Sequence, residues 1–268
     1  MYVTCHKHAE MTHPYRWGAG RMVQEGVYME SLVEKVVLIT GGTRGIGRAL
    51  AERCVELGAA VVICCRHESH VIETIEALAT QGGGLVGGMQ CDIARYEEVR
   101  ALFAYAVEKF GGVDILVNNA GLPQHGPLHE MTPFPDEWDY VLATNLMGAV
   151  YCSHEAIPLM MQKGGGWIVN VSSLAAEETE GGNAAYATSK AALNAFSESV
   201  MNEVRQQGIH VGVISPGLVN TEFGGKRLGH PERALQPEDI VEAIIAMVTA
   251  PERSLTSMVE IRPRWVKG

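Results

Sequence analysis

A glycine-rich turn between an apolar run and a helical pattern constrains the fold of this chain more than any other stretch. Residues 36–39 read Val-Val-Leu-Ile, a run typical of a strand buried on both faces. Thr40–Gly47 follows, and Arg48–Leu57 then places apolar side chains at helical spacing. Glycines let the backbone turn tightly and bring its amide groups close to an anion at the N-terminus of the helix. Because no Gly-Lys-Ser/Thr follows, the turn predicts a pyrophosphate site of the dinucleotide type rather than a P-loop.

The same alternation of strand and helix continues along the chain. The predicted strands are residues 36–39, 61–65, 85–91, 113–117, 168–171, 211–214 and 257–262. The predicted helices are residues 48–57, 71–81, 97–110, 137–161, 184–206 and 237–248. Alternation of this kind predicts an α/β chain, a single-domain Rossmann fold with a doubly wound, mainly parallel seven-stranded sheet.

The first 33 residues lack the periodicity of the remainder. We therefore expect residues 1–33 to form a flexible N-terminal extension and residues 34–268 to form the Rossmann-fold domain. The extension contains four residues of types that bind metals: Cys5, His6, His8 and His13. Without a fixed scaffold we interpret them as tail residues, and we predict no metal site.

Composition excludes several classes of partner. The formal net charge of −10 argues against a nucleic-acid surface, which needs clustered Lys and Arg. No apolar run approaches the ~20 residues that cross a bilayer, so we expect no membrane segment. The first thirty residues lack a continuous apolar stretch, which makes a secretory signal unexpected. The six cysteines show no C-x-x-C spacing and are interpreted as reduced thiols of a cytoplasmic protein.

A tyrosine and a lysine four residues apart carry the predicted chemistry. Tyr186 and Lys190 share one face of the 184–206 helix, where an ammonium is expected to lower the pKa of the phenol and make it a general acid or base. Ser173 ends the 168–171 strand, where a hydroxyl can face a ligand. Ser172 is the rival, but it is expected to point to the other face. Tyr-x-x-x-Lys alone also occurs as a surface helix pair, and it becomes specific only with a dinucleotide site upstream.

Together these residues resemble the short-chain dehydrogenase/reductase family from Val36 to Pro263. The matching motifs are Thr40-Gly41-x-x-x-Gly45-Ile46-Gly47, Asp92, Asn118-Asn119-Ala120-Gly121, Asn145, Ser173, Tyr186-x-x-x-Lys190 and Pro216-Gly217. Their order and spacing agree with the family, including its G-x-x-x-G-x-G form of the glycine turn.

The resemblance implies a set of site residues. The implied catalytic residues are Asn145, Ser173, Tyr186 and Lys190, with Asn145 holding a water that relays protons toward Lys190. The implied cofactor-binding residues are Gly41, Thr43, Arg44, Gly45, Ile46, Gly47, Arg66, Asp92, Ile93, Asn119, Ala120, Gly121, Tyr186, Lys190, Pro216, Gly217, Val219 and Thr221. Among these residues, Asp92 is expected to hydrogen-bond the adenine of the cofactor. Of Asn118 and Asn119, one is expected to serve mainly the turn at the strand end.

Two arginines indicate which cofactor is used. A site for NAD usually places a carboxylate at the end of the second strand, to bind the ribose 2′-OH. Here Cys65 occupies that position, Arg66 follows it, and Arg44 lies in the glycine turn. Guanidinium groups suit a 2′-phosphate, so NADP(H) is the predicted cofactor. The alternative is that either arginine is a solvated surface charge.

The family resemblance implies an NADP-preferring carbonyl reductase, similar to 3-oxoacyl reductases, that acts on a small-molecule carbonyl or alcohol. The alternatives are an oxidative alcohol dehydrogenase and a catalytically silent NADP(H)-binding sensor or scaffold.

The loop 175–183 is expected to border the mouth of the site, where its three glutamates disfavour anionic substrates unless they are merely solvated. Residues 222–236 are expected to form a lid. Family members pair through their two long helices, which implies a homo-oligomer, a dimer or a tetramer.

Overall fold

A computed structural model of the chain describes residues 17–18, 21–24, 27–81, 85–225, 231–251 and 253–265, with backbone only for residues 17–30. The strands of the main sheet are β4 (Val36–Thr40), β5 (Ala60–Cys65), β6 (Val86–Gln90), β7 (Ile115–Asn118), β8 (Gly166–Val171), β9 (Ile209–Pro216) and β10 (Met258–Ile261). The helices are α1 (Gly45–Glu56), α2 (Glu68–Gln81), α3 (Tyr96–Phe110), α4 (Asp136–Leu142), α5 (Gly148–Lys163), α6 (Ala184–Val204) and α7 (Pro237–Val248).

The seven strands pair in the order β10-β9-β8-β7-β4-β5-β6, and every neighbouring pair is parallel. The predicted α/β fold with a doubly wound, seven-stranded parallel sheet is therefore confirmed. Strand order reverses beside β4, because the chain passes from β4 to β5 on one side and later adds β7 on the other. Ligands of open α/β sheets bind at such a switch point, beyond the carboxyl ends of the strands.

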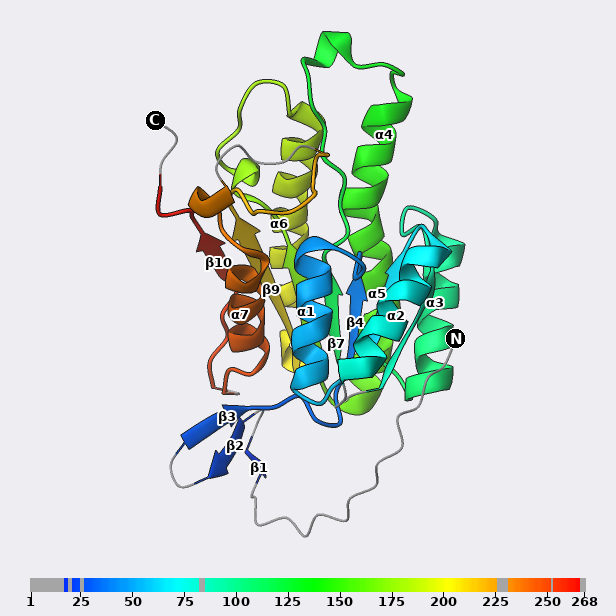
Figure 1. Cartoon of the computed structure of the whole chain (residues 1–268), viewed down its shortest axis with the longest axis vertical. Coiled ribbons are helices and arrows are strands. Elements are labelled where there is room, and N and C mark those ends of the chain that lie inside the picture. The colour runs from blue at the N-terminus through cyan, green and yellow to red at the C-terminus, as the bar shows by residue number, and fades with distance from the viewer. Residues whose placement is uncertain are drawn as a thin grey trace.

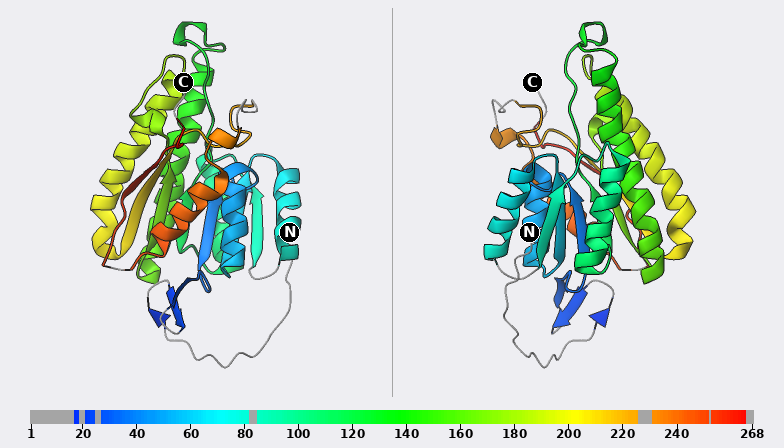
Figure 2. Two further views of the ribbon diagram at one scale, coloured as in Figure 1. Left: turned by 60° about the vertical axis from the view of Figure 1, so that its left-hand side comes forward. Right: turned by 90° about the vertical axis from the view of Figure 1, so that its right-hand side faces the viewer.

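Helices cover both faces of the sheet (Figures 1 and 2). Along β4, Val37 and Ile39 pack toward α1, α2 and α7, whereas Val36 and Leu38 pack toward α3, α5 and α6. Alternate residues of a strand point to opposite faces, so an unbroken apolar run supplies both layers. All five residues of β4 are buried, which explains why the run contains no alternating polar positions.

Two segments differ from the sequence prediction. The helix predicted over 137–161 is divided into α4, a π-helical turn at Ala143–Met147, and α5. A π-turn inserts one residue into the helical repeat, which apolar periodicity does not reveal. Residues 17–30 contain three short strands, β1 (Trp17–Gly18), β2 (Arg21–Gln24) and β3 (Val27–Glu30), in an antiparallel sheet. Sequence periodicity did not predict them, and the flexibility expected of residues 1–33 stays a prediction, since residues 1–16 lie outside the described part.

A buried chain of amides fixes α6 against the sheet. The Asn118 side-chain amide donates to Asn170 Oδ1 at 2.8 Å, and the Asn170 amide donates to Ser197 Oγ at 2.7 Å. Asn170 is fully buried, so each lost bond would leave a polar group without water. These bonds connect β7, β8 and α6 beneath the carboxyl ends of the strands. The amide chain thus sets the position of the helix that carries Tyr186 and Lys190.

Candidate active site

A cavity of about 720 Å³ opens at the carboxyl ends of the strands. It is lined by every predicted site residue except Gly47 and Asn145: Gly41, Thr43, Arg44, Gly45, Ile46, Arg66, Asp92, Ile93, Asn119, Ala120, Gly121, Ser173, Tyr186, Lys190, Pro216, Gly217, Val219 and Thr221. Residues that are far apart in the sequence therefore meet in one cavity, at the position that the strand order predicts.

The glycine turn offers this cavity a surface for an anion. Gly41 and Gly45 have φ angles of 67° and 53°, in the left-handed region that glycine tolerates. A Cβ on Gly45 would lie 3.2 Å from Thr221 Cγ2, on the wall of the cavity. Helix α1 has no acidic residue in its first turn and no side-chain cap from the residues that the structure describes. Its free amide groups and partial positive charge suit a diphosphate.

Gly47 does not line the cavity, but the close packing of the glycine turn requires it. A Cβ there would collide with the Gly41 carbonyl oxygen and come within 2.5 Å of Asn119 Nδ2. That Asn119 amide donates to the carbonyl oxygens of Thr40 and Gly41, at 2.9 and 3.2 Å. Asn119 therefore holds the turn against β7, while Asn118 belongs to the buried amide chain.

Charged and polar groups gather at the end of the cavity beside β5 and β6. The Asp92 carboxylate accepts from the Ala94 amide at 3.1 Å and from the Tyr140 hydroxyl at 3.0 Å. Arg44 and Arg66 are both exposed, and Cys65 occupies the end of β5 with its thiol donating to the His67 carbonyl at 3.2 Å. The end of β5 thus carries no carboxylate, and two guanidinium groups border the cavity there.

Lys190 lies at the opposite end and is almost fully buried, with 3% of its surface exposed. Its ammonium donates to the Val171 carbonyl oxygen at 2.8 Å, which anchors α6 to the end of β8. Burial disfavours the charged form and lowers the pKa of Lys190 from 10.5 to about 8. Lys190 Nζ is 5.8 Å from the centre of the Tyr186 ring.

The pKa of Tyr186 differs from the sequence-based expectation. Lys190 was expected to lower it, but burial raises the pKa of Tyr186 above 10, and the Ser173 side chain opposes this rise. At 5.8 Å from the ring, with its ammonium on a carbonyl, Lys190 does not outweigh the loss of hydration. The phenol of the ligand-free protein is therefore protonated at neutral pH.

Hydrogen bonds distinguish the two serines that follow β8. Ser172 is buried, and its hydroxyl donates to the Lys190 carbonyl oxygen at 3.3 Å. Ser173 faces the cavity, and its oxygen accepts from the Ala175 amide at 3.2 Å. The two hydroxyls thus have different partners, and Ser173 is the one that interacts with Tyr186.

Asn145 lies behind the cavity wall, within the π-turn. Its Oδ1 accepts from the Leu122 amide at 2.7 Å, and its Nδ2 donates to the Leu122 carbonyl at 2.9 Å and to Ser189 Oγ at 3.0 Å. The side chain therefore connects the loop after β7 to α6, one residue before Lys190. This arrangement positions neighbouring groups, whereas the water relay implied by the family resemblance stays a prediction.

Apolar and acidic residues form the mouth beside Tyr186. The Phe223 ring centre is 5.9 Å from that of Tyr186, and Leu174 and Leu218 also line the cavity. Of the loop glutamates, Glu178 accepts from the Arg262 guanidinium at 2.6 Å. This ion pair offsets one of the three negative charges expected at the mouth. Of the expected lid 222–236, residues 226–230 lie outside the described part.

Sequence reasoning missed two residues that organise the site. Gln124 is 2% exposed, and its Oε1 accepts from the Ala185 amide at 3.2 Å, in the first turn of α6. Tyr140 joins Arg66 to Asp92. Both act through contacts with residues at least 48 positions away, and neither belongs to a local motif.

In the described part of the chain, no three His, Cys, Asp or Glu side chains gather closely enough to hold a metal ion. None of the described helices has the length and apolar character needed to cross a bilayer. The cavity itself presents the phenol of Tyr186, the hydroxyl of Ser173 and the buried ammonium of Lys190.

Comparison with known sequences identifies relatives. A sequence model of the family described as short chain dehydrogenase matches residues 35–230. An uncharacterized oxidoreductase of Staphylococcus saprophyticus is 32% identical over 235 residues, which make up 88% of this chain and 100% of that protein. An uncharacterized oxidoreductase of Staphylococcus aureus is 30% identical with the same coverage.

Solved structures share the fold. A metagenomic short-chain oxidoreductase in complex with NADP is 32% identical, with a TM-score of 0.77 over 88% of this chain and 100% of that one. An alcohol dehydrogenase from the archaeon Thermococcus sibiricus, complexed with 5-hydroxy-NADP, is 25% identical, with a TM-score of 0.81 over 87% of this chain and 98% of that one.

The lowered pKa of Lys190 predicts a stability change with pH. Between pH 8 and 10.5 the unfolded chain binds more protons than the folded chain, because the pKa of Lys190 is about 8 in the folded protein and returns to its ordinary 10.5 on unfolding. Lys190 should therefore contribute a rise of up to about 3 kcal/mol to the free energy of unfolding across this window. The buried thiols of Cys54, Cys64 and Cys152, whose pKa values are raised in the folded protein, contribute a fall above about pH 9, so the Lys190 contribution is measured as the difference between the wild type and Lys190→Met. Urea unfolding followed by tryptophan fluorescence, from about pH 7.5 to about pH 10, measures the rise.

In Lys190→Met this contribution to the slope should be absent. Lys35→Met is the matched control, because Lys35 is exposed, and it should keep the wild-type slope. Equal slopes in the wild type and in Lys190→Met would contradict the burial of a charged ammonium at this position.

Proposed function

The chain is an oxidoreductase that belongs to the short chain dehydrogenase family, and from this premise we propose that it interconverts a carbonyl compound and a secondary alcohol with NADP(H). The observation that carries the proposal is the arrangement within one cavity. Ser173, Tyr186 and Lys190 lie at one end, and Arg44 and Arg66 border the other. The glycine turn lines the same cavity between the two groups, and its amides suit a diphosphate.

The residues divide the chemistry among them. When bound, the cofactor supplies or accepts a hydride at the nicotinamide ring. Ser173 donates a hydrogen bond to the carbonyl oxygen, where negative charge develops. Tyr186 donates a proton to the same oxygen. Lys190 would hold the nicotinamide ribose of the bound cofactor and, as an ammonium, would stabilise the phenolate that Tyr186 becomes.

The pKa of Tyr186 favours the reductive direction. Burial keeps the phenol protonated at neutral pH, which is the form that donates a proton to a carbonyl. Oxidation of an alcohol needs the phenolate, which becomes available only as the pH rises. Oxidation remains the second candidate, because the Thermococcus sibiricus neighbour is described as an alcohol dehydrogenase.

NADP(H) rather than NAD(H) is supported by charge. Cys65 leaves the end of β5 without the carboxylate that binds a ribose 2′-OH. Arg44 and Arg66 offer positive charge and hydrogen-bond donors for a 2′-phosphate. The metagenomic neighbour, a complex with NADP, gives independent support by similarity.

The mouth supports a small or medium ketone, aldehyde or 3-oxoacyl compound as the substrate. Leu174, Leu218 and Phe223 supply an apolar wall beside Tyr186. A catalytically silent sensor is disfavoured, because Asn145, Ser173, Tyr186 and Lys190 are all present. We further propose a cytoplasmic location, in line with the free thiols at positions 54, 64, 65, 91 and 152. A homo-oligomer, a dimer or a tetramer, is proposed from the resemblance to the family.

Replacing Tyr186 by Phe tests the mechanism. The variant keeps the ring but cannot donate the proton, so kcat for carbonyl reduction should fall by about a hundredfold or more. Its Kd for NADPH should stay largely unchanged. The measurement is the loss of reduced-nicotinamide absorbance with a panel of ketones, aldehydes and 3-oxoacyl thioesters. Tyr151→Phe, outside the cavity lining, is the control and should keep wild-type turnover. Full kcat in Tyr186→Phe would rule out its role as the acid.

Cofactor preference is tested by binding. Titrations should give a Kd for NADPH well below that for NADH. Arg66→Ala should raise the NADPH Kd by about tenfold or more, because charge-assisted hydrogen bonds to phosphate are lost. Its NADH Kd should change little. Arg100→Ala is the control, since Arg100 is exposed and pairs with Glu97. Equal affinity of the wild type for NADH and NADPH would refute the proposed preference.

A further inference from the structure

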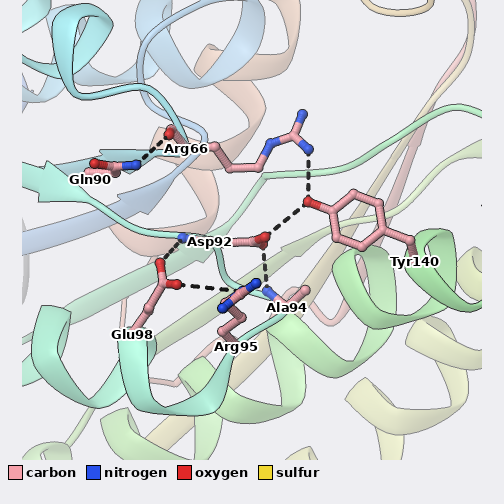
Figure 3. A network of polar contacts seen from close by, with 7 residues as sticks. All are labelled: Arg66, Gln90, Asp92, Ala94, Arg95, Glu98 and Tyr140. Atoms are coloured by element: carbon pink, nitrogen blue, oxygen red, sulfur yellow. Dashed lines mark hydrogen bonds and ion pairs between the residues drawn. The ribbon is translucent and has the colours of Figure 1, made fainter.

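One phenol hydroxyl links the two charged groups at the adenosine end of the cavity (Figure 3). The Tyr140 oxygen accepts from Arg66 Nη1 at 2.8 Å and donates to Asp92 Oδ2 at 3.0 Å. The three residues come from different elements: Arg66 follows β5, Asp92 follows β6, and Tyr140 belongs to α4. The hydroxyl uses its donor and an acceptor at once, so the bridge has a defined direction from guanidinium to carboxylate.

Tyr140 is the group that orders the Arg66 guanidinium. Arg66 is exposed, and a long side chain at a strand end has many rotamers. Within the described residues, its guanidinium makes no side-chain hydrogen bond other than the one to Tyr140. The guanidinium carbon lies 5.7 Å from the centre of the Tyr140 ring, a separation that follows from the hydrogen bond to the hydroxyl. Tyr140 therefore holds Arg66 through its hydroxyl.

Both anchors of the bridge are themselves held. The Arg66 carbonyl oxygen accepts from Gln90 Nε2 at 2.9 Å, which fixes the backbone at the end of β5. The Asp92 amide donates to Glu98 Oε2 at 2.8 Å, and Asp92 Oδ1 accepts from the Ala94 amide. Beside Tyr140, Val141 is buried and anchors α4. The Tyr140 hydroxyl is thus fixed by α4 and by the Asp92 carboxylate, and it holds the Arg66 guanidinium in one position.

The bridge leaves the guanidinium free to bind an anion. The phenol separates Arg66 from Asp92, so that the arginine is not neutralised by a direct ion pair. A guanidinium carries five N–H donors, and Tyr140 uses one of them. The remaining donors suit the bidentate recognition of a phosphate. A side chain that is ordered before binding loses less entropy when the ligand arrives.

We propose that Tyr140 is a positioning residue that selects NADP(H) by holding Arg66 for the 2′-phosphate of the cofactor. This inference rests on the proposed function, since it names how one residue of that site is organised. Tyr140 itself does not touch the reacting atoms. Its effect is therefore confined to affinity for the phosphorylated cofactor.

Tyr140→Phe tests the proposal, because it removes the hydroxyl and keeps the ring. The Kd for NADPH should rise about three- to tenfold, the range for loss of one hydrogen bond together with its preorganisation. The Kd for NADH should change by less than about twofold, since NADH lacks the phosphate that Arg66 would contact. Isothermal titration of the full-length protein measures both constants. Tyr96→Phe is the matched control, because Tyr96 donates to the Glu155 carboxylate at 2.7 Å away from the cavity, and neither Kd should change.

A double-mutant cycle separates positioning from a general structural role. In the Arg66→Ala background, Tyr140→Phe should have no further effect on the NADPH Kd, because there is no guanidinium left to hold. An equal rise for NADPH and NADH in Tyr140→Phe would overturn the proposal, since it would mean that Tyr140 supports the adenine pocket through Asp92. An additive effect in the double variant would overturn it as well.

The failure of this inference can be told from the failure of the proposed function. If Arg66→Ala weakens NADPH binding and Tyr140→Phe does not, Tyr140 is not a positioning residue, and the NADP(H) preference stands. If the wild type does not prefer NADPH, both are overturned. If the wild type prefers NADPH but Arg66→Ala leaves the NADPH Kd unchanged, the inference about Tyr140 and the role of Arg66 are overturned, and the preference stands.

Discussion

The hydrogen bond from the Lys190 ammonium to the Val171 carbonyl oxygen is the interaction on which the site depends. It joins α6 to the carboxyl end of β8 at 2.8 Å, where Ser172 and Ser173 follow. The buried amides of Asn118 and Asn170 support the same junction from below. A charged lysine at 3% exposure costs stability. Under the proposed function, this cost is offset by the role of the ammonium beside the Tyr186 phenol.

The two ends of the cavity differ in the charged groups that line them. At the catalytic end, burial lowers the pKa of Lys190 and raises that of Tyr186, so the proton resides on the phenol at neutral pH. At the end beside β5 and β6, the Tyr140 hydroxyl stands between the Arg66 guanidinium and the Asp92 carboxylate. Between the two ends, the amides of α1 present partial positive charge, and the first turn of the helix contains no acidic side chain. These environments are the ones that the proposed binding of a dinucleotide requires.

The parts of this account that sequence predicts are those encoded locally. The apolar run of β4 and the glycines after it specify a strand, a turn and a helix start within a short stretch, and Tyr186 and Lys190 share one helix face. Sequence did not reveal the π-turn at 143–147 or the bridge from Tyr140 to Arg66, which are 74 residues apart. It also indicated the wrong direction for the Tyr186 pKa, because spacing reveals a neighbouring charge but not the burial that outweighs it.

Isotope transfer tests the central claim, that the cavity joins a nicotinamide to a carbonyl carbon beside Tyr186. The protein would be incubated with NADPH deuterated at both C4 positions and the carbonyl compound that it reduces fastest. Mass spectrometry of the alcohol product then locates the label. We predict one deuterium on the carbinol carbon of every product molecule, because a hydride transferred directly from the nicotinamide to the carbonyl carbon does not exchange with water. An alcohol product without deuterium at that carbon would contradict the account.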